Sequence, residues 1–234
     1  MKKTRFLIFG QSRSGSGLLV DLLNSHPDIQ CDSELMNRNG IRSKDIFRRL
    51  LIERFPYIYI NHQVHKQAGN AYGFKLLFHQ LSKYPGIKSK LFNQKWKIIH
   101  IRRKDILAQT LSGIIARETG KYHRYRQDVV DDRLFTLDPK TVAKKLNHRS
   151  KAKEGELELL NGLNYCDIVY EDDLADSNNW SSSMARVFNY LGVQPCEVSA
   201  KILKTDNRAN DKRILNYSEI LDYLKNNGFG HILK

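Results

Sequence analysis

The feature that most constrains the fold is a glycine-rich turn placed directly between a short apolar run and an amphipathic helix. Residues 6–9 read as a buried strand, and the turn of residues 10–17 follows at once. Leucines then recur at helical spacing, at Leu18, Leu19, Leu22 and Leu23. A strand, a glycine turn and a helix together direct backbone N–H groups and the positive end of a helix dipole at one anion. The sequence therefore predicts a phosphate-binding loop.

This loop differs from the two commonest nucleotide-binding loops. The triphosphatase pattern G-x-x-x-x-G-K-[ST] begins correctly with Gly10 and Gly15, but Ser16 occupies the place of the phosphate-binding lysine. The dinucleotide pattern G-x-G-x-x-G fails because no third glycine follows Gly15 and Gly17. What remains is either a phosphate loop with Arg13 inside it or an ordinary glycine-rich turn between a strand and a helix.

The charge of the chain calls for an anionic partner. The 234 residues carry a net charge of +14, and 41% of them are hydrophobic, which suits one domain with a full core. The basic residues are dispersed along the chain and match no nucleic-acid-binding module. The three cysteines form no CxxC pair, and no apolar run is long enough for a leader or a membrane span. We therefore expect a soluble, cytoplasmic protein.

A second chemical signal lies in mid-sequence, where an apolar run ends in two arginines. Residues 96–101 read as a central strand, Arg102 and Arg103 follow, and the next helix carries Ser112. A guanidinium group can make two parallel charge-assisted hydrogen bonds to a phosphate. Neighbouring side chains on a strand point in opposite directions, so the register favours Arg103, with Arg102 in reserve. Magnesium-dependent phosphoryl transfer would instead favour an aspartate here.

The remaining segments suggest the outline of the fold. Residues 43–55 and 138–163 read as helices, and residues 165–170 read as another buried strand. Residues 120–134 are polar and without period, as in a loop over a site. Residues 201–213 are also polar, and we expect them to cover a bound nucleotide.

The glycine-rich loop resembles the 5′-phosphosulfate-binding loop of sulfotransferases that use 3′-phosphoadenosine 5′-phosphosulfate (PAPS) and release 3′-phosphoadenosine 5′-phosphate (PAP). In that family the loop reads roughly R-S-G-[ST]-[ST]-x-L. The matching residues, the last of them direct or offset by one, are Arg13, Ser14, Gly15, Ser16 and Leu18. Gly17 departs from the pattern, which usually has a hydroxyl residue there, although the N–H of Gly17 can still donate. The resemblance implies that this loop holds the 5′-phosphate and that Arg13 stabilises the leaving oxygen.

The mid-sequence motif resembles the 3′-phosphate site of the same family, in a bacterial and carbohydrate-type branch similar to Nod-factor and trehalose sulfotransferases. The form R-x-[DN]-x-L-x-Q-x-x-S is matched by Arg103, Asp105, Gln109 and Ser112. The family's Y-E-D-L segment, with one residue inserted, and its L-G-V segment follow in the same order. The resemblance implies that Arg103 and Ser112 bind the 3′-phosphate.

Two further residues gain roles from the resemblance. Glu34 follows a helix-closing His-Pro pair, as does the proposed general base of a trehalose sulfotransferase, and is expected to take the proton of an acceptor hydroxyl. Lys75 lies in a GFK segment that recurs in Nod-factor-type sulfotransferases, and it is expected to neutralise charge on the bridging oxygen. Solvent-facing positions without catalytic roles are the alternative for both. His79 and His65 are reserve candidates for the base.

The sequence thus predicts an α/β fold of the P-loop type, a parallel sheet with helices on both faces, formed as a single domain over residues 1–234. The expected activity is transfer of a sulfuryl group from PAPS to a hydroxyl of a carbohydrate or other small acceptor, giving PAP. We expect no metal ion, nucleic acid or membrane span. The alternatives are a P-loop small-molecule kinase and a non-catalytic protein that binds an anionic ligand or nucleic acid. The acceptor and the oligomeric state stay open.

Overall fold

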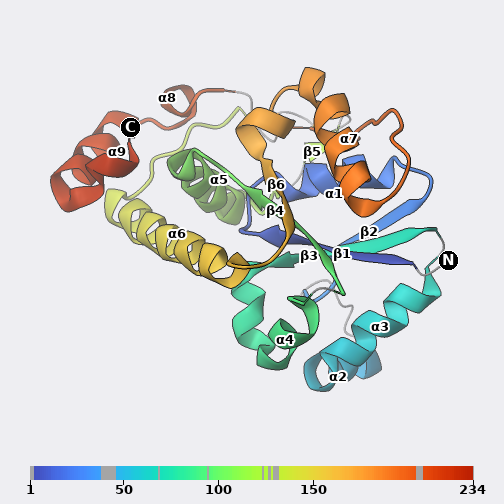
Figure 1. The fold of residues 1–234 in the computed structure, drawn as a ribbon. Coiled ribbons are helices and arrows are strands. Elements are labelled where there is room, and N and C mark those ends of the chain that lie inside the picture. The colour runs from blue at the N-terminus through green and yellow to red at the C-terminus, as the bar shows by residue number, and fades with distance from the viewer. Residues whose placement is uncertain are drawn as a thin grey trace.

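A five-stranded sheet, in which each strand runs parallel to its neighbours, forms the centre of the structure, a computed structural model (Figure 1). The structure describes residues 3–37, 46–67, 69–93, 95–122, 124–125, 128, 132–203 and 208–233. The strand order is β2-β3-β1-β4-β6. These strands are β1 (Thr4–Gly10), β2 (Ile29–Glu34), β3 (Ala71–Leu77), β4 (Lys97–Arg102) and β6 (Tyr165–Val169). The predicted α/β class with a parallel sheet is confirmed.

Helices cover both faces of this sheet because the side chains of β1 alternate between them. Phe6 and Ile8 are fully buried on one side, in an apolar cluster with α1 (Ser16–Asn24) and α7 (Trp180–Leu191). Leu7 is fully buried on the opposite side, and Figure 1 shows α2, α3 and α4 there. Those helices are α2 (Ile46–Arg54), α3 (Pro56–Lys66) and α4 (Lys88–Leu91). Both faces of β1 are apolar, as a central strand requires.

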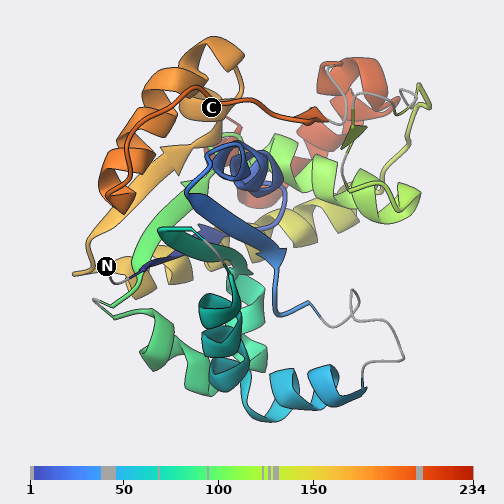
Figure 2. The ribbon, with the colours of Figure 1, turned by 90° about the vertical axis from the view of Figure 1, so that its right-hand side faces the viewer.

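A third apolar cluster joins α5 (Ile106–Thr119), α6 (Pro139–Leu160) and α9 (Tyr217–Leu224), which lie together in the views of Figures 1 and 2. The short helix α8 (Asn210–Arg213) precedes α9, and a small antiparallel pair joins β5 (Arg124–Tyr125) to β7 (Ile202–Leu203). Helix α6 starts where the sequence predicts it, because the Asp138 carboxylate accepts hydrogen bonds from the N–H groups of Lys140 and Thr141.

The cluster matters for function because it fixes α6 beside the end of the sheet. Contacts between α5 and α6, and between α6 and α9, hold this long helix in place.

In the part of the chain that the structure describes, no helix is both long and apolar enough to cross a membrane.

Candidate active site

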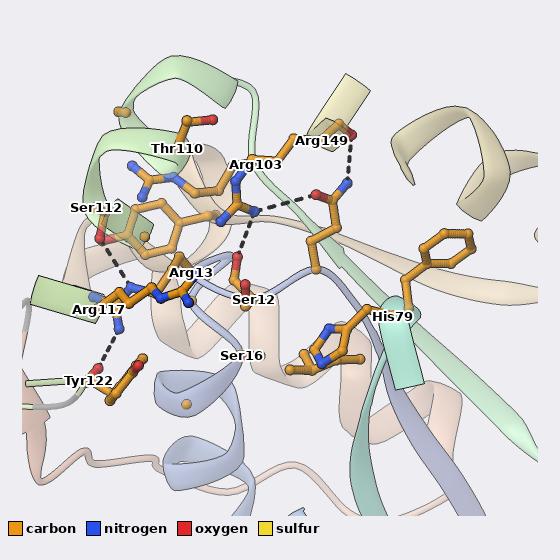
Figure 3. Close-up of a pocket in the computed structure, with 18 of the residues that line it drawn as sticks. Ser12, Arg13, Ser16, His79, Arg103, Thr110, Ser112, Arg117, Tyr122 and Arg149 are labelled. Carbon is orange, nitrogen blue, oxygen red and sulfur yellow. Dashed lines mark hydrogen bonds between the residues drawn. The ribbon is translucent and has the colours of Figure 1, made fainter. Parts of the chain in front are cut away.

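A large cleft lies at the carboxyl ends of the parallel strands (Figure 3). Its volume is about 1840 Å³. The walls come from the loop after β1, from the ends of β2 and β3, and from α5 and α6. Parallel α/β sheets bind their ligands at this edge, because the loops that follow the strands meet there.

The loop after β1 needs glycine at two positions. A Cβ atom at Gly10 would lie 2.2 Å from the carbonyl oxygen of Ile101 on β4, which is far closer than atoms can approach. Gly15 has φ 91°, in the left-handed region, and its Cβ atom would lie 2.4 Å from the ring of Tyr170. Only glycine combines that backbone conformation with that contact. The glycines therefore shape a loop packed tightly between β4 and Tyr170.

Hydrogen bonds from two sides hold the loop in this shape. The Ser14 hydroxyl donates to the carbonyl of Gln11 at 2.8 Å, and Nε2 of Gln109 on α5 donates to the carbonyl of Ser12 at 2.9 Å. Helix α1 then begins at Ser16, and the residues of its first turn line the cleft. The first N–H groups of a helix have no carbonyl partner within that helix. This end of α1 can therefore bind an anion.

Arg13 links the loop to the helix that carries the second motif. It is the one non-glycine residue with positive φ, 65°, among the described residues. Its Nε donates to the hydroxyl of Ser112 at 3.1 Å, and its Nη1 donates to the carbonyl of Tyr122 (Figure 3). Burial, together with the charges of Arg103 and Arg213, lowers the pKa of Arg13. The two sequence motifs therefore meet directly, and they meet in a strongly positive environment.

Arg103 lines the cleft, where its guanidinium is held by two neighbours. Its Nε donates to the Glu171 carboxylate at 3.2 Å, and its guanidinium carbon lies 4.6 Å from the centre of the Tyr170 ring. Glu171 also accepts a hydrogen bond from the N–H of Lys104 at 2.8 Å, so it is itself fixed. A stacked guanidinium with a fixed partner can present its other N–H groups to a phosphate.

Arg102 lies apart from the residues that line the cleft and pairs with Asp167 on β6. Its Nε and Nη2 donate to Oδ2 of Asp167 at 3.0 and 2.8 Å. The same carboxylate lies 3.2 Å from Nδ1 of buried His100, whose Nε2 lies 3.6 Å from the buried Glu156 carboxylate. Arg102 is thus part of a polar cluster between β4, β6 and α6. It lies outside the cleft lining, although it was the reserve candidate for binding the 3′-phosphate.

Glu34 and Lys75 form an ion pair at the cleft. A register shift on β2 between Asp32 and Glu34 sets Glu34 opposite Lys75 on β3. The Nζ atom of Lys75 lies 3.1 Å from Oε1 of Glu34, and Nε2 of Gln80 donates to Oε2 at 3.2 Å. Lys75 is almost fully buried, whereas the side chain of Glu34 is 26% exposed. The carboxylate that was expected to be a base is therefore oriented by two donors and open to the cleft.

Of the two histidines that were reserve candidates for the general base, one lies in the cleft and the other does not. His79 lines the cleft, and its pKa is lowered mainly by burial, with Glu34 opposing the shift and Lys83 and His148 adding to it. His65 is on α3, apart from the residues that line the cleft. Within the described residues, no group of three or more His, Cys, Asp or Glu side chains is arranged to hold a metal ion.

Sequence reasoning missed two residues of the cleft. Tyr170 contacts both Gly15 and the Arg103 guanidinium, although the sequence placed it only at a strand end and in the Y-E-D-L segment, without a role in the site. Arg149 on α6 reaches the loop, although residues 138–163 were predicted only as a long polar helix. The α6 residues that line the cleft recur at helical spacing, but the sequence alone does not show which face of this helix meets the cleft. They are Thr141, Lys145, His148, Arg149 and Ala152.

The predicted loop over the site and the predicted nucleotide cover fall partly outside the described residues. Residues 123, 126–127 and 129–131 of the first segment and 204–207 of the second are not described. Of the described residues in these segments, six line the cleft: Tyr122, Ile202, Arg208, Ala209, Asn210 and Arg213.

Comparison with known proteins gives one relative in sequence and several in structure. No family model matches the chain. Over 125 residues the chain is 26% identical to Nodulation protein H of Rhizobium tropici. The match spans 53% of this chain and 50% of that relative, so the chain spans about half the length of the curated relative it matches.

The fold matches a crystal structure over almost its whole length. A sulfotransferase from Alicyclobacillus acidocaldarius has a TM-score of 0.54 at 16% identity, covering 97% of this chain and 96% of that one. A mouse sulfotransferase, SULT7A1 complexed with PAP, has a TM-score of 0.46 at 15% identity over 84% of this chain and 62% of its own. The predicted resemblance to sulfotransferases is confirmed, and the chain shares the fold of the Alicyclobacillus acidocaldarius sulfotransferase.

The polar cluster around His100 predicts how stability depends on pH. Burial lowers the pKa of His100, but the carboxylates of Asp167 and Glu156 outweigh it and raise that pKa above its ordinary value of 6.5. Because the pKa of His100 is higher in the folded state than in the unfolded state, its protonation stabilises the fold fully at pH values below the unfolded-state pKa. We expect the free energy of unfolding of the native protein to exceed that of the His100→Gln variant at low pH, and this difference to shrink as pH rises through the folded-state pKa. Urea unfolding at a series of pH values measures it, and a constant difference between the two proteins from about pH 5.5 to 8.5 would contradict it.

Proposed function

We propose that this chain is a sulfotransferase that moves a sulfuryl group from PAPS to a hydroxyl of a carbohydrate or other small acceptor. One observation carries the proposal: Arg13 and Arg103, from two motifs far apart in sequence, line one cleft together with the open first turn of α1. Two cationic groups beside a helix N-terminus suit a ligand with anionic groups at both ends. PAPS is such a ligand, and the likeness to Nodulation protein H and to a sulfotransferase fold supports the proposal.

The two phosphates of the donor are assigned to different parts of the cleft. The first-turn N–H groups of α1 and the N–H groups of the loop bind the 5′-phosphate, beside the charge of Arg13. Arg103 and Ser112 bind the 3′-phosphate. ATP has no phosphate at its 3′ position, so this second contact selects PAPS over ATP.

The reaction then needs a base and a cation near the sulfur atom. Glu34, oriented by Lys75 and Gln80, accepts the proton of the acceptor hydroxyl as its oxygen attacks sulfur. The bond between sulfur and the 5′-phosphate oxygen breaks, and Arg13 and Lys75 stabilise the negative charge that develops on that oxygen. The products are a sulfate ester and PAP.

A thermal-shift comparison separates the proposed donor from the alternatives. At about one hundred times its dissociation constant, PAP should raise the melting temperature by about 5–10 °C, because ligand binding stabilises only the folded state. ATP with Mg²⁺, and a single-stranded oligonucleotide, should give smaller shifts at the same concentration. The largest shift with ATP and Mg²⁺ would instead indicate a kinase, and the largest shift with the oligonucleotide a nucleic-acid-binding protein.

The two adjacent arginines offer a matched pair of variants. Arg103→Ala should weaken PAP binding by about 200-fold, because losing a bidentate charged contact costs on the order of 3 kcal/mol. Arg102→Ala removes the same charge from the other side of the strand end and breaks the pair with Asp167, so it should lower stability and leave PAP affinity nearly unchanged. Isothermal titration calorimetry measures both. Equal affinities for the native protein and Arg103→Ala would refute the assignment.

Replacement of Glu34 tests the base. With an acceptor found by screening hydroxyl compounds against labelled PAPS, Glu34→Gln should lower the turnover number by about 10²- to 10⁴-fold and leave PAP affinity within about twofold. Asp32→Asn is the control, because that carboxylate is on the same strand, accepts from the Tyr72 hydroxyl and lies outside the cleft lining. If Glu34→Gln kept the turnover number of the native protein, Glu34 would not be the base, and His79 would be the next candidate to replace.

A further inference from the structure

Arg149 joins α6 to the loop that precedes Arg13. Its Nη1 donates to the carbonyl of Ser12 at 3.0 Å and lies 3.4 Å from Oε1 of Gln11 (Figure 3). The carbonyl of Arg149 in turn accepts a hydrogen bond from Nε2 of Gln11 at 3.1 Å. The loop and the helix are therefore connected in both directions, and the guanidinium lies over the start of the loop.

Only one of the three guanidinium nitrogens takes part in these contacts. Within the described part of the chain, neither Nη2 nor Nε of Arg149 makes a hydrogen bond, and no carboxylate lies within ion-pair distance of this guanidinium. Arg149 lines the cleft, so its remaining donors are available to a bound molecule. A partly buried arginine whose remaining donors face a cleft, with no carboxylate in ion-pair contact, suggests an anionic ligand.

Gly113 makes the room that Arg149 occupies. A Cβ atom at Gly113 on α5 would lie only 2.8 Å from Nη2 of Arg149 and 3.7 Å from Cγ of Arg13. Glycine in the middle of a helix costs about 1 kcal/mol relative to alanine, so its presence needs a reason. Here the missing side chain lets the guanidinium of Arg149 lie against α5.

The surroundings of Arg149 disfavour its positive charge. Burial, followed by the charges of Arg13 and Arg103, lowers the pKa of Arg149 to about 10, and Glu156 opposes the shift. The group still carries a full positive charge at neutral pH. Three cations converge on one space, and an anion bound among them would relieve their repulsion.

We propose that Arg149 is a third arginine ligand of the donor and binds its 5′-phosphosulfate end. This inference rests on the proposed function. The 5′ end is chosen because Arg149 contacts Gln11 and Ser12, directly before the segment Arg13–Gly17 that is assigned to the 5′-phosphate. The α6 helix thereby takes part in donor recognition, and Gly113 leaves room for the guanidinium of Arg149.

Calorimetric titrations of three nucleotides test this assignment. Relative to the native protein, Arg149→Met should bind PAP and adenosine 5′-monophosphate at least about ten-fold more weakly, because a charged contact is lost. Its affinity for adenosine 3′-monophosphate should stay within about twofold. Lys151→Met removes the same charge from an exposed position on the same helix and should leave all three affinities unchanged.

The other outcomes overturn the assignment in distinguishable ways. Equal losses for all three nucleotides would show that Arg149 only supports the loop, and unchanged affinities or a loss confined to the 3′-monophosphate would show that it does not bind the 5′ end. Failure of the native protein to bind PAP at all would refute the proposed function itself. Gly113→Ala keeps every charge and favours the helix, so it tests the same point if Arg149→Met does not fold; it should show a smaller loss with the same selectivity.

Discussion

The mutual repulsion of three guanidinium groups in one cleft is the constraint on which the rest of the site depends. Arg13 comes from the loop after β1, Arg103 from the end of β4, and Arg149 from α6. Burial and this proximity lower the pKa of Arg13 and of Arg149. Neutral groups such as the carbonyls of Ser12 and Tyr122 hold two of the three in place. Such an arrangement is suited to an anion that brings the missing negative charge.

Local physical rules were enough to predict the parts of the site that are close in sequence. The strand, glycine turn and first helix form one continuous unit, so residues 6–23 reveal them without knowledge of the rest of the chain. The alternation of side chains along a strand distinguished Arg103 from Arg102, and the structure places the former in the cleft and the latter against Asp167. The cap at Asp138 likewise set the start of α6.

The parts that sequence reasoning missed depend on contacts between distant segments. Nothing near Arg149 in the sequence shows that α6 lies across the cleft, since its position is set by packing against α5 and α9. The ion pair of Glu34 with Lys75 results from a register shift in β2 that alternation alone does not predict. Helix α3 was not predicted either, because its start at Pro56 follows immediately on the end of α2 at Arg54. Each case is decided by tertiary packing.

The most direct measurement is a crystal structure of the protein with PAP bound. The proposed function predicts that the 3′-phosphate lies within about 3.2 Å of donors from Arg103 and Ser112, and the 5′-phosphate at the same distance from the first-turn N–H groups of α1. PAP bound elsewhere, or bound in the cleft with neither phosphate at these groups, would contradict the central claim that the arginines of the cleft recognise a doubly phosphorylated adenosine.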